Sequence, residues 1–415
     1  MYSKIGNFIK ANWSGTIKPP RNGDDEFITI PFPYTVPSID DFFTEMYYWD
    51  TYFTNVGLIL SDNVAQAKNN VDNMVYFINK YGFVPNASVV SSLDRSQPPF
   101  FSQMAREIFE ITEDKAWLER DIYPAVIKEY DYWENKRSTP NGLNCYSTST
   151  TDEGRLIECA AHLCRRFSLE MPEDKETQLE WGRNALAIFE SGWDCSSRFG
   201  WNGHSIAPIC LASLLYMLEK NAAYFAEILG KADDFKLWNE RADKRQQKIN
   251  KLLWDEQAGA FRDLNYVTGE QSSLLSVATF YPLWVKLATK EQADKIVKAL
   301  SIFETEYGLA CCENSDNLLN GQWDYPHGWA PQHYIAIKGL LNYGKKDDAL
   351  RIAKKYAKLV ASTFEETGNL WEKYNVVTGT VATKVEGHAT SPTMMGWSAG
   401  VFLYCCDFLR KNGCI

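Results

Sequence analysis

The sequence predicts an all-α protein in which helical hairpins close into a toroid of alternating inner and outer helices. Apolar residues recur at three- and four-residue spacing in roughly a dozen segments, with about 35 residues per helix and loop, which is typical of stacked helical hairpins. Strand signals are few, at 27–36 and 260–271. Because no Pro/Ser-rich linker divides the chain, we expect one domain over residues 1–415, with a short irregular or extended N-terminal segment over residues 1–40.

The predicted helices follow one another with short breaks. The segment 63–82 shows the pattern well, because its apolar residues share one face and Gly82 follows the last of them. The other segments with this pattern are 49–61, 116–135, 154–171, 207–230, 233–254, 274–288, 290–301, 331–344, 345–366 and 396–413.

The composition is that of a globular protein and disfavours several classes of partner. Hydrophobic residues make up 45% of the chain and charged residues 23%, so long disordered stretches are not expected. The net charge is −10, from 43 basic and 53 acidic residues, and no basic block is present. This balance disfavours nucleic acid and anionic membranes as partners and leaves the oligomeric state open.

The ten cysteines suggest a reducing compartment. Two pairs are adjacent, Cys311–Cys312 and Cys405–Cys406, and adjacent cysteines are poor disulfide partners. No CxxC or Cys/His spacing indicates a metal, so no cofactor is expected. The N-terminus has no apolar run of signal-peptide length, and no segment approaches the roughly 18 apolar residues that span a bilayer. We therefore expect a cytoplasmic protein, or a periplasmic one if a leader has been removed.

Aromatic residues are the compositional outlier, at 14% of the chain with 14 Trp and 22 Tyr. One interpretation is aromatic packing in a large core. The other is a pocket lined with rings, which suits a small saccharide, because pyranose C–H faces stack on aromatic faces while carboxylates, amides and guanidinium groups bind hydroxyls. Segments that interrupt the helical rhythm combine such groups, at 43–53, 84–102, 151–155, 190–198, 322–332 and 370–392.

These segments carry the residue types that a glycosidase needs. One carboxyl group must be protonated to donate to the leaving oxygen, and a second must be ionised, either to activate water or to attack directly. Asp194 is a candidate for the protonated group because Trp193 beside it can desolvate it, with a helix N-cap as the alternative. For Asp50, a structural role at a helix N-terminus or as acceptor of a tryptophan N–H is an equally weighted alternative to a role in the site. Arg95 and Arg198 could form structural ion pairs.

Several segments together resemble the trehalase family. The stretch QWDYPHGWAPQ (322–332) matches the signature Q-W-D-x-P-x-G-W-x-P at every fixed position. ESGWDCSSR (190–198) resembles the segment that carries the family's general acid. PYTVPSIDDFFTEMYYWDTYF (33–53) resembles P-G-G-R-F-x-E-x-Y-x-W-D-x-Y, and 81–101 resembles Y-G-x-I-P-N…R-S-Q-P-P. The matches run in the family's order over residues 27–410, and they imply an (α/α)6 toroid and an inverting hydrolase.

The resemblance also assigns roles to individual residues. Asp194 occupies the position of the general acid, and Glu372 that of the general base, with Glu386 as the competing candidate for the base. Inversion requires the two carboxyl groups to lie roughly 6.5–9.5 Å apart. The expected substrate-binding residues are Phe43, Tyr47, Trp49, Asp50, Asn86, Arg95, Gln97, Glu153, Arg155, Trp193, Gln322, Trp323, Asp324, Glu386 and Trp397.

The departures from the family concern the leaving-group side of the pocket. Phe42 stands where a substrate-binding arginine is expected. The R-P-E-S-Y motif is absent, and Glu153 and Arg155 in TDEGR lie near its place. The glycine-rich lid is replaced by VEGHATSPTMMG (385–396). The half that binds the non-reducing glucose is therefore expected to be retained, and the leaving-group half to be rebuilt.

The first hypothesis is accordingly an inverting α-glycosidase that acts on trehalose or a similar small α-glucoside. Alternatives within enzymes are glucosylglycerate, mannosylglycerate, kojibiose or sucrose as substrate. A carbohydrate-binding protein without catalysis is a further alternative, against which the presence of both Asp194 and Glu372 argues. A sugar epimerase of similar architecture is disfavoured because histidines are few, although His327 and His388 lie in site loops and could bind hydroxyls.

Overall fold

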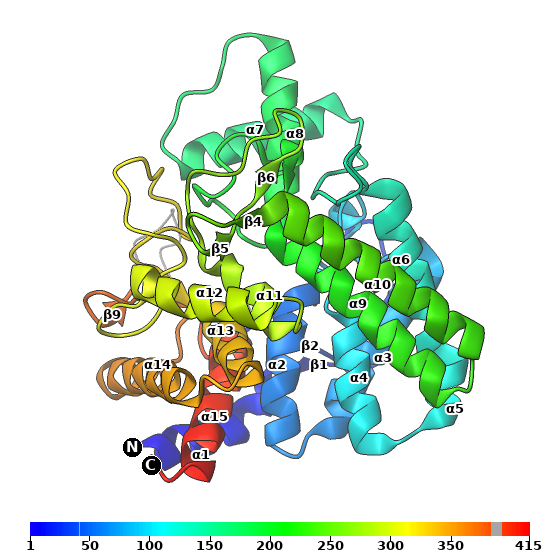
Figure 1. The fold of residues 1–415 in the computed structure, drawn as a ribbon. Coiled ribbons are helices and arrows are strands. Elements are labelled where there is room, and N and C mark those ends of the chain that lie inside the picture. The colour runs from blue at the N-terminus through cyan, green and yellow to red at the C-terminus, as the bar shows by residue number, and fades with distance from the viewer. Residues whose placement is uncertain (41, 383–391) are drawn as a thin grey trace.

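The computed structural model describes residues 1–40, 42–382 and 392–415, and helices dominate it (Figure 1). The α-helices are α1 (Tyr2–Thr16), α2 (Tyr48–Leu60), α3 (Val64–Tyr81), α4 (Phe101–Thr112), α5 (Lys115–Trp117), α6 (Tyr123–Lys136), α7 (Glu153–Arg166), α8 (Lys175–Ser191), α9 (Ile209–Ile228), α10 (Ala232–Leu253), α11 (Tyr281–Trp284), α12 (Lys290–Phe303), α13 (Ala330–Asn342), α14 (Lys346–Thr367) and α15 (Gly396–Lys411).

The strands are short and serve to join loops. They are β1 (Ile17–Lys18), β2 (Tyr34–Thr35), β3 (Ile206–Ala207), β4 (Trp254–Asp255), β5 (Ala260–Phe261), β6 (Leu264–Asn265), β7 (His327–Trp329), β8 (Lys373–Asn375) and β9 (Thr380–Val381). Most pair in twos, as β1-β2, β3-β6 and β4-β5, while β7, β8 and β9 form one antiparallel sheet with β8 in the centre. Short helical turns link other elements, at η1 (Val90–Ser92), η2 (Leu118–Ile122), η3 (Gly203–Ser205) and η4 (Val277–Phe280).

Burial divides the helices into two layers, which confirms the expected (α/α)6 toroid. Helices of the inner layer are buried on nearly all sides, as in α2, α9, α13 and α15. Helices of the outer layer bury a single stripe and expose charged residues, as in α3, α10 and α14. Inner and outer helices pack as pairs, with α9 against α10 and α13 against α14, and the inner α2 packs on α15 (Figure 1). This last contact brings the two ends of the ring together.

Three local predictions differ from the structure. The expectation of an irregular or extended segment over residues 1–40 is wrong for residues 2–16, which form α1, because Ile5, Ile9 and Trp13 recur every four residues and bury one face. Helices α4 and α8 also lie outside the predicted segments. The predicted helix 274–288 is instead η4 followed by the single turn α11, which begins where Pro282 stands in its first turn.

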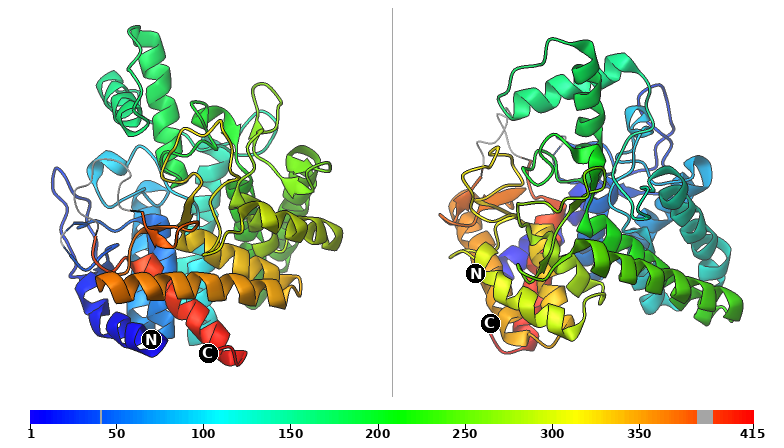
Figure 2. Two further views of the ribbon diagram at one scale, coloured as in Figure 1. Left: turned by 90° about the vertical axis from the view of Figure 1, so that its left-hand side faces the viewer. Right: turned by 45° about the horizontal axis from the view of Figure 1, so that its top comes forward.

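The α7–α8 hairpin projects from the body of the toroid (Figure 2), and its end carries residues toward the site. Helix α8 ends at Gly192, which has a φ of +71°, and the chain then turns into the segment that contains Asp194. Among the described helices, none combines the length and apolar character needed to cross a membrane. None of the ten cysteines forms a disulfide in the described structure.

Candidate active site

A cavity of about 220 Å³, open to solvent, lies where the loops of several inner helices meet. It gathers residues from five of the segments that interrupt the predicted helical pattern, although these are far apart in the sequence. Its lining consists of Pro37, Phe42, Phe43, Tyr47, Trp49, Asp50, Asn86, Gln97, Arg166, Gly192, Asp194, Gln322, Trp323, Trp329, Glu372, Lys373, Ala382, Pro392, Met395 and Trp397.

Four tryptophans in contact with one another, Trp49, Trp323, Trp329 and Trp397, form what we call the floor of the cavity. Trp323 and Trp329 stack face to face, with ring centroids 3.9 Å apart and planes at 4°. Trp397 meets the edge of Trp329 at 5.4 Å, and Trp49 lies 5.5 Å from Trp323. All four are nearly fully buried. The rings therefore offer a rigid apolar surface to whatever occupies the cavity.

The pairing of β7 with β8 explains how Glu372 reaches this floor. Trp329 pairs with Lys373 in register, so that Glu372 precedes the central strand of the sheet. The Lys373 ammonium lies 2.6 Å from Oε2 of Glu372, donates to Oε1 of Gln322 at 3.2 Å, and sits 4.9 Å from the ring centre of Trp329. The indole N–H of Trp397 donates to the Glu372 carbonyl. Glu372 is thus held as the partner of a buried cation at the edge of the floor.

Asp194 is placed by the turn that ends α8. A Cβ added to Gly192 would lie 2.7 Å from the Trp49 ring, so the chain passes against the floor with no room for a side chain. Trp193 is fully buried and donates its backbone N–H to the Ser191 hydroxyl. Its ring packs on Trp323 and under the guanidinium of Arg198. Asp194 follows with 35% of its side chain exposed and faces the cavity.

The predicted desolvation of Asp194 by Trp193 is therefore not the arrangement in the structure, because Trp193 points into the protein beneath the floor. A charged neighbour of Asp194 is Arg166, the last residue of α7, with Nη1 3.9 Å from Oδ2 of Asp194. Arg166 was not among the predicted site residues. Its sequence context, two arginines at the end of an amphipathic helix, is that of an ordinary helix terminus and gives no signal of a site.

Asp50 is a third carboxyl group in the same cavity. Its enclosed position, followed by the charges of Glu372 and then Asp194, raises the pKa of Asp50 to about 8, against a backbone hydrogen bond that lowers it. Burial, reinforced by the nearby carboxylates, also raises the pKa of Tyr47 above its usual range. Three carboxyl groups within mutual electrostatic reach are typical of a site that handles protons.

The segment 84–102 contributes two amides that are anchored by the protein and face the cavity. Nδ2 of Asn86 donates to the carbonyls of Ser96 and Phe189, both at 3.0 Å. Oε1 of Gln97 accepts from the backbone N–H of Trp49 at 3.0 Å. Both amides are thus fixed in orientation relative to the floor and to the end of α8.

The cavity includes many of the predicted site residues and leaves out others. Those that line it are Phe43, Tyr47, Trp49, Asp50, Asn86, Gln97, Asp194, Gln322, Trp323, Glu372 and Trp397. Glu386 and His388 lie outside the described residues. The cavity lining does not include Arg95, Glu153, Arg155, Trp193, Asp324 or His327. It adds Phe42, Arg166, Trp329, Lys373 and Met395, which were not predicted as ligands.

Physical reasons account for the predicted ligands that lie outside the cavity lining. Glu153 forms an exposed ion pair with Lys175. Arg95 and Arg155 both bind Asp94, at 2.7 and 2.6 Å. Asp324 is fully buried and accepts from the backbone and hydroxyl of Ser197 and from the backbone of Gly321.

These placements give the residues partners within the protein. Asp324 braces the loop of Asp194 against the floor, because its acceptors are taken up by protein donors. Arg95 and Arg155 hold the segment 84–102 in place through Asp94. The basic group beside the candidate acid is Arg166, and it comes from the other end of α7 than Arg155 does.

The cavity sets several carboxyl groups against a floor of tryptophans within a helical toroid, and a pair of facing carboxyl groups is what glycoside hydrolysis requires. The chain belongs to the trehalase family, whose model matches residues 10–410.

Known proteins support this assignment over most of the chain. It is 34% identical over 402 residues to a probable trehalase of Eremothecium gossypii, covering 87% of this chain and 54% of that protein. It is 30% identical over 425 residues to a periplasmic trehalase of Escherichia coli, covering 97% of this chain and 73% of that protein. The chain thus spans only about half the length of the first of these relatives.

Solved structures agree. The neutral trehalase of Saccharomyces cerevisiae superposes with a TM-score of 0.77 at 29% identity, covering 92% of this chain and 76% of that one. A mannosylglycerate hydrolase of Thermus thermophilus, in complex with glucose, superposes with a TM-score of 0.67 at 15% identity, over 97% and 98% of the two chains. At that identity the second likeness speaks for the fold alone.

Proposed function

We propose that the protein hydrolyses trehalose, with Asp194 as general acid and Glu372 as general base. The observation that carries this proposal is that both carboxyl groups, from loops 178 positions apart by their residue numbers, line one cavity above a floor of tryptophans. The family membership and the trehalases among its relatives support the same substrate.

The surroundings of Glu372 suit the role of general base. Glu372 has the Lys373 ammonium as counter-charge, which suits a base that must be ionised to take a proton from water. Asp194 lines the same cavity and keeps 35% of its side chain exposed. In the proposed step, Asp194 gives its proton to the glycosidic oxygen while Glu372 takes one from a water that attacks the anomeric carbon.

The floor and the anchored amides suit a glucose ring. The stacked pair Trp323 and Trp329, with Trp397 at its edge, offers a flat apolar surface. Asn86 and Gln97 use one end of each amide for internal hydrogen bonds, and a sugar hydroxyl can bind Oδ1 of Asn86 and Nε2 of Gln97. Asp50, with its raised pKa, can donate to one hydroxyl oxygen when protonated.

A proton NMR time course on trehalose tests substrate and stereochemistry together. Inversion releases one β-glucose and one α-glucose from each trehalose, whereas retention releases two α-glucose molecules. Early β-glucose, observed before mutarotation, therefore indicates inversion. Release of α-glucose alone would contradict inversion, and no turnover of trehalose would contradict the substrate.

A second candidate substrate is an α-glucoside with an acidic leaving group, such as glucosylglycerate. The observation that favours it is Arg166 beside Asp194, together with Phe42 in the cavity at the position where the family has an arginine. Parallel kcat/KM measurements on trehalose, glucosylglycerate, mannosylglycerate, kojibiose and sucrose discriminate the two. A higher value for an acidic substrate than for trehalose would favour this second candidate.

We extend the proposal to a reducing, cytoplasmic location. Its support is that the ten cysteines, nine of them buried, form no disulfide in the described structure, whereas disulfides are typical of proteins from oxidising compartments. Fractionation of the source cells with detection of the protein by antibody tests this, and recovery from the periplasm would contradict it.

A further inference from the structure

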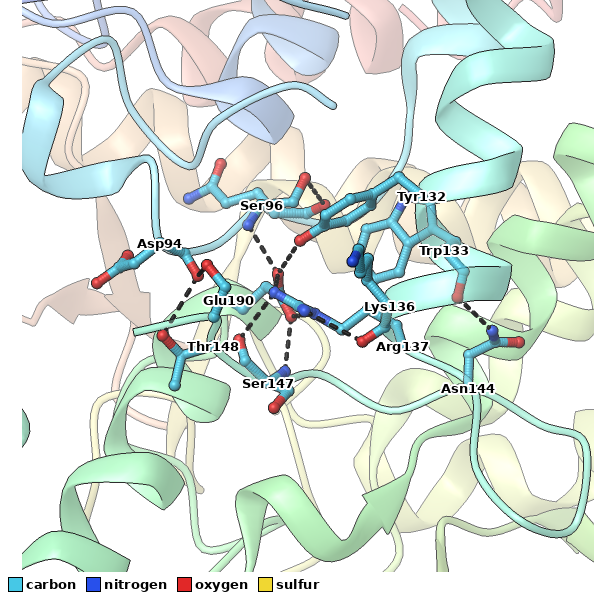
Figure 3. Close-up of polar contacts among 12 residues, drawn as sticks. Asp94, Ser96, Tyr132, Trp133, Lys136, Arg137, Asn144, Ser147, Thr148 and Glu190 are labelled. Carbon is cyan, nitrogen blue, oxygen red and sulfur yellow. Dashed lines mark hydrogen bonds and ion pairs between the residues drawn. The ribbon is translucent and has the colours of Figure 1, made fainter. Parts of the chain in front are cut away.

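Glu190 is a fully buried carboxylate that the sequence reasoning did not single out as a functional residue. It accepts five hydrogen bonds (Figure 3). Oε1 accepts from the backbone N–H of Ser96 at 2.7 Å, the hydroxyl of Tyr132 at 3.2 Å and Nη2 of Arg137 at 2.8 Å. Oε2 accepts from Nε of Arg137 at 2.8 Å and the backbone N–H of Ser147 at 2.6 Å. We call Glu190 and the four residues that donate to it the Glu190 clamp.

The donors of the clamp come from three segments that are separate in the sequence. Ser96 lies in the segment 84–102, Tyr132 and Arg137 lie on and just after α6, and Ser147 lies in the loop before α7 (Figure 3). Glu190 itself is in the last turn of α8. The carboxylate thus ties three parts of the chain to the end of α8.

Two of the joined parts carry cavity residues. Ser96 immediately precedes Gln97, and its carbonyl accepts from the side chain of Asn86, which also donates to the Phe189 carbonyl beside Glu190. On the other side, Glu190 precedes Asp194 by four residues. The amides that face the cavity and the candidate acid are therefore linked through the Glu190 carboxylate as well as through the hydrogen bond from Asn86 to the Phe189 carbonyl.

The residues between Glu190 and Asp194 have little conformational freedom. The Ser191 hydroxyl donates to the Ile188 carbonyl and accepts from the Trp193 backbone, which fixes the turn after the helix. Gly192 passes against the Trp49 ring in a backbone conformation that only glycine adopts easily. A shift at Glu190 is consequently passed on to Asp194 rather than absorbed in between.

We propose that Glu190 is a positioning residue, which sets where the Asp194 carboxyl lies relative to Asn86, Gln97 and the tryptophan floor. This rests on the proposed function for the roles of those residues. A carboxylate suits the task because it only accepts, and all four donors converge on its two oxygens. An amide in its place would turn N–H groups toward the guanidinium and the backbone N–H groups, so the clamp could not close in the same geometry.

Glu190→Gln tests this proposal, with Glu219→Gln as matched control. Glu219 is also buried and pairs with a buried arginine, Arg245 at 2.9 Å, but it lies on α9, which contributes nothing to the cavity lining. Both variants should lose thermal stability. We expect Glu190→Gln to lower kcat on trehalose about 10²-fold with KM within about threefold, because a displacement of roughly 1 Å in a catalytic group has that effect.

The control should keep kcat within about twofold at the same temperature interval below its own Tm. Equal loss of kcat in the two variants, or an unchanged kcat in Glu190→Gln, would overturn the proposal, since a merely structural residue lowers stability without a selective effect on kcat. If Glu190→Gln does not fold, Arg137→Lys replaces it. That variant keeps the charge but loses the bidentate contact, and it should show a smaller kcat loss of about tenfold.

Crystal structures of the wild type and Glu190→Gln separate failure of this proposal from failure of the proposed function. If the wild type cleaves none of the glycosides tested, the proposed function is wrong. The positions still decide the present inference: we expect the Asp194 carboxyl to move by about 1 Å or more relative to the Gln97 amide. An unchanged distance between the two would overturn it, whatever the substrate.

Discussion

The floor of the cavity is made of tryptophans that are nearly fully buried, whereas its mouth, which we define by Phe42, Arg166 and Asp194, stays in contact with solvent. Phe42 is 40% exposed and Asp194 35%. The floor is fixed by ring contacts and a strand pairing. The comparison teaches that the surface proposed to hold one glucose is built into the core, while the part proposed to meet the leaving group can change without disturbing that core.

The largest expected effect comes from the two proposed catalytic carboxyl groups. Asp194→Asn and Glu372→Gln should each lower kcat by about 10²–10⁴-fold, because each removes a proton donor or acceptor while keeping the shape of the side chain. Glu153→Gln is the matched control, since Glu153 forms only an exposed pair with Lys175 and should keep kcat. Steady-state kinetics on trehalose check this, and full activity in either catalytic variant would reassign its role.

Truncation of a side chain should lower the free energy of unfolding much more in the floor than at the mouth. Trp323→Ala removes a ring that is 2% exposed and stacked on Trp329, and it should lower the free energy of unfolding by about 3–5 kcal/mol. Phe42→Ala should change it by about 0.5 kcal/mol or less and act mainly on KM. Denaturant titration of both variants measures the contrast, which disappears if Phe42→Ala is as destabilising as Trp323→Ala.

Arg166 should set the pH dependence at the mouth. A cation 3.9 Å from Asp194 favours the ionised form of that carboxyl, which is the wrong form for an acid. Arg166→Met should therefore move the alkaline limb of the kcat–pH profile upward by about half a unit, a modest shift because solvent screens the pair. The other carboxyl groups of the cavity, Asp50 and Glu372, are unchanged in the Arg166→Met variant, so the difference between variant and wild type reports the loss of Arg166. A profile that does not move, or moves down, contradicts this.

Asp50 should act on the pH dependence of stability. Because its folded-state pKa of about 8 lies above the ordinary value of about 3.9, the folded protein holds a proton that the unfolded chain releases. Wild-type stability is thus lost as pH rises between these values, and an amide carries no such penalty. The Tm of Asp50→Asn minus that of the wild type should grow from pH 4 to pH 8 in thermal scans. A constant difference would contradict the raised pKa.

The sequence allowed prediction of the toroid and of most of the floor for identifiable reasons. Helical periodicity marked the inner and outer helices, and Trp49, Trp323 and Trp397 stood in segments too aromatic and too irregular for ordinary loops. Trp329 belongs to the same aromatic stretch and stacks on Trp323 with ring centroids 3.9 Å apart. The local sequence pattern sufficed here because each tryptophan stands among residues that already indicate an aromatic, irregular segment.

The rest depended on where distant segments meet. Asp324 lies in the best-matched motif, yet its acceptors are occupied by Ser197 and Gly321, which no pattern around it reveals. Arg166 enters the cavity because α7 happens to end there. Glu153, near the place of a missing motif, instead meets Lys175 on the surface. Long-range contacts decide such cases, and spacing along one chain does not encode them.

The antiparallel sheet of β7, β8 and β9 has a practical consequence for protein engineering. Strand β8 is hydrogen-bonded to β7 on one side and to β9 on the other. Glu372 directly precedes β8, so the sheet anchors it without a contribution from Phe42, Arg166 or Asp194 at the mouth. We expect that segments outside this sheet can be exchanged between relatives while Glu372, the proposed general base, stays in place. Substrate range could then be redesigned by grafting, without rebuilding the catalytic apparatus each time.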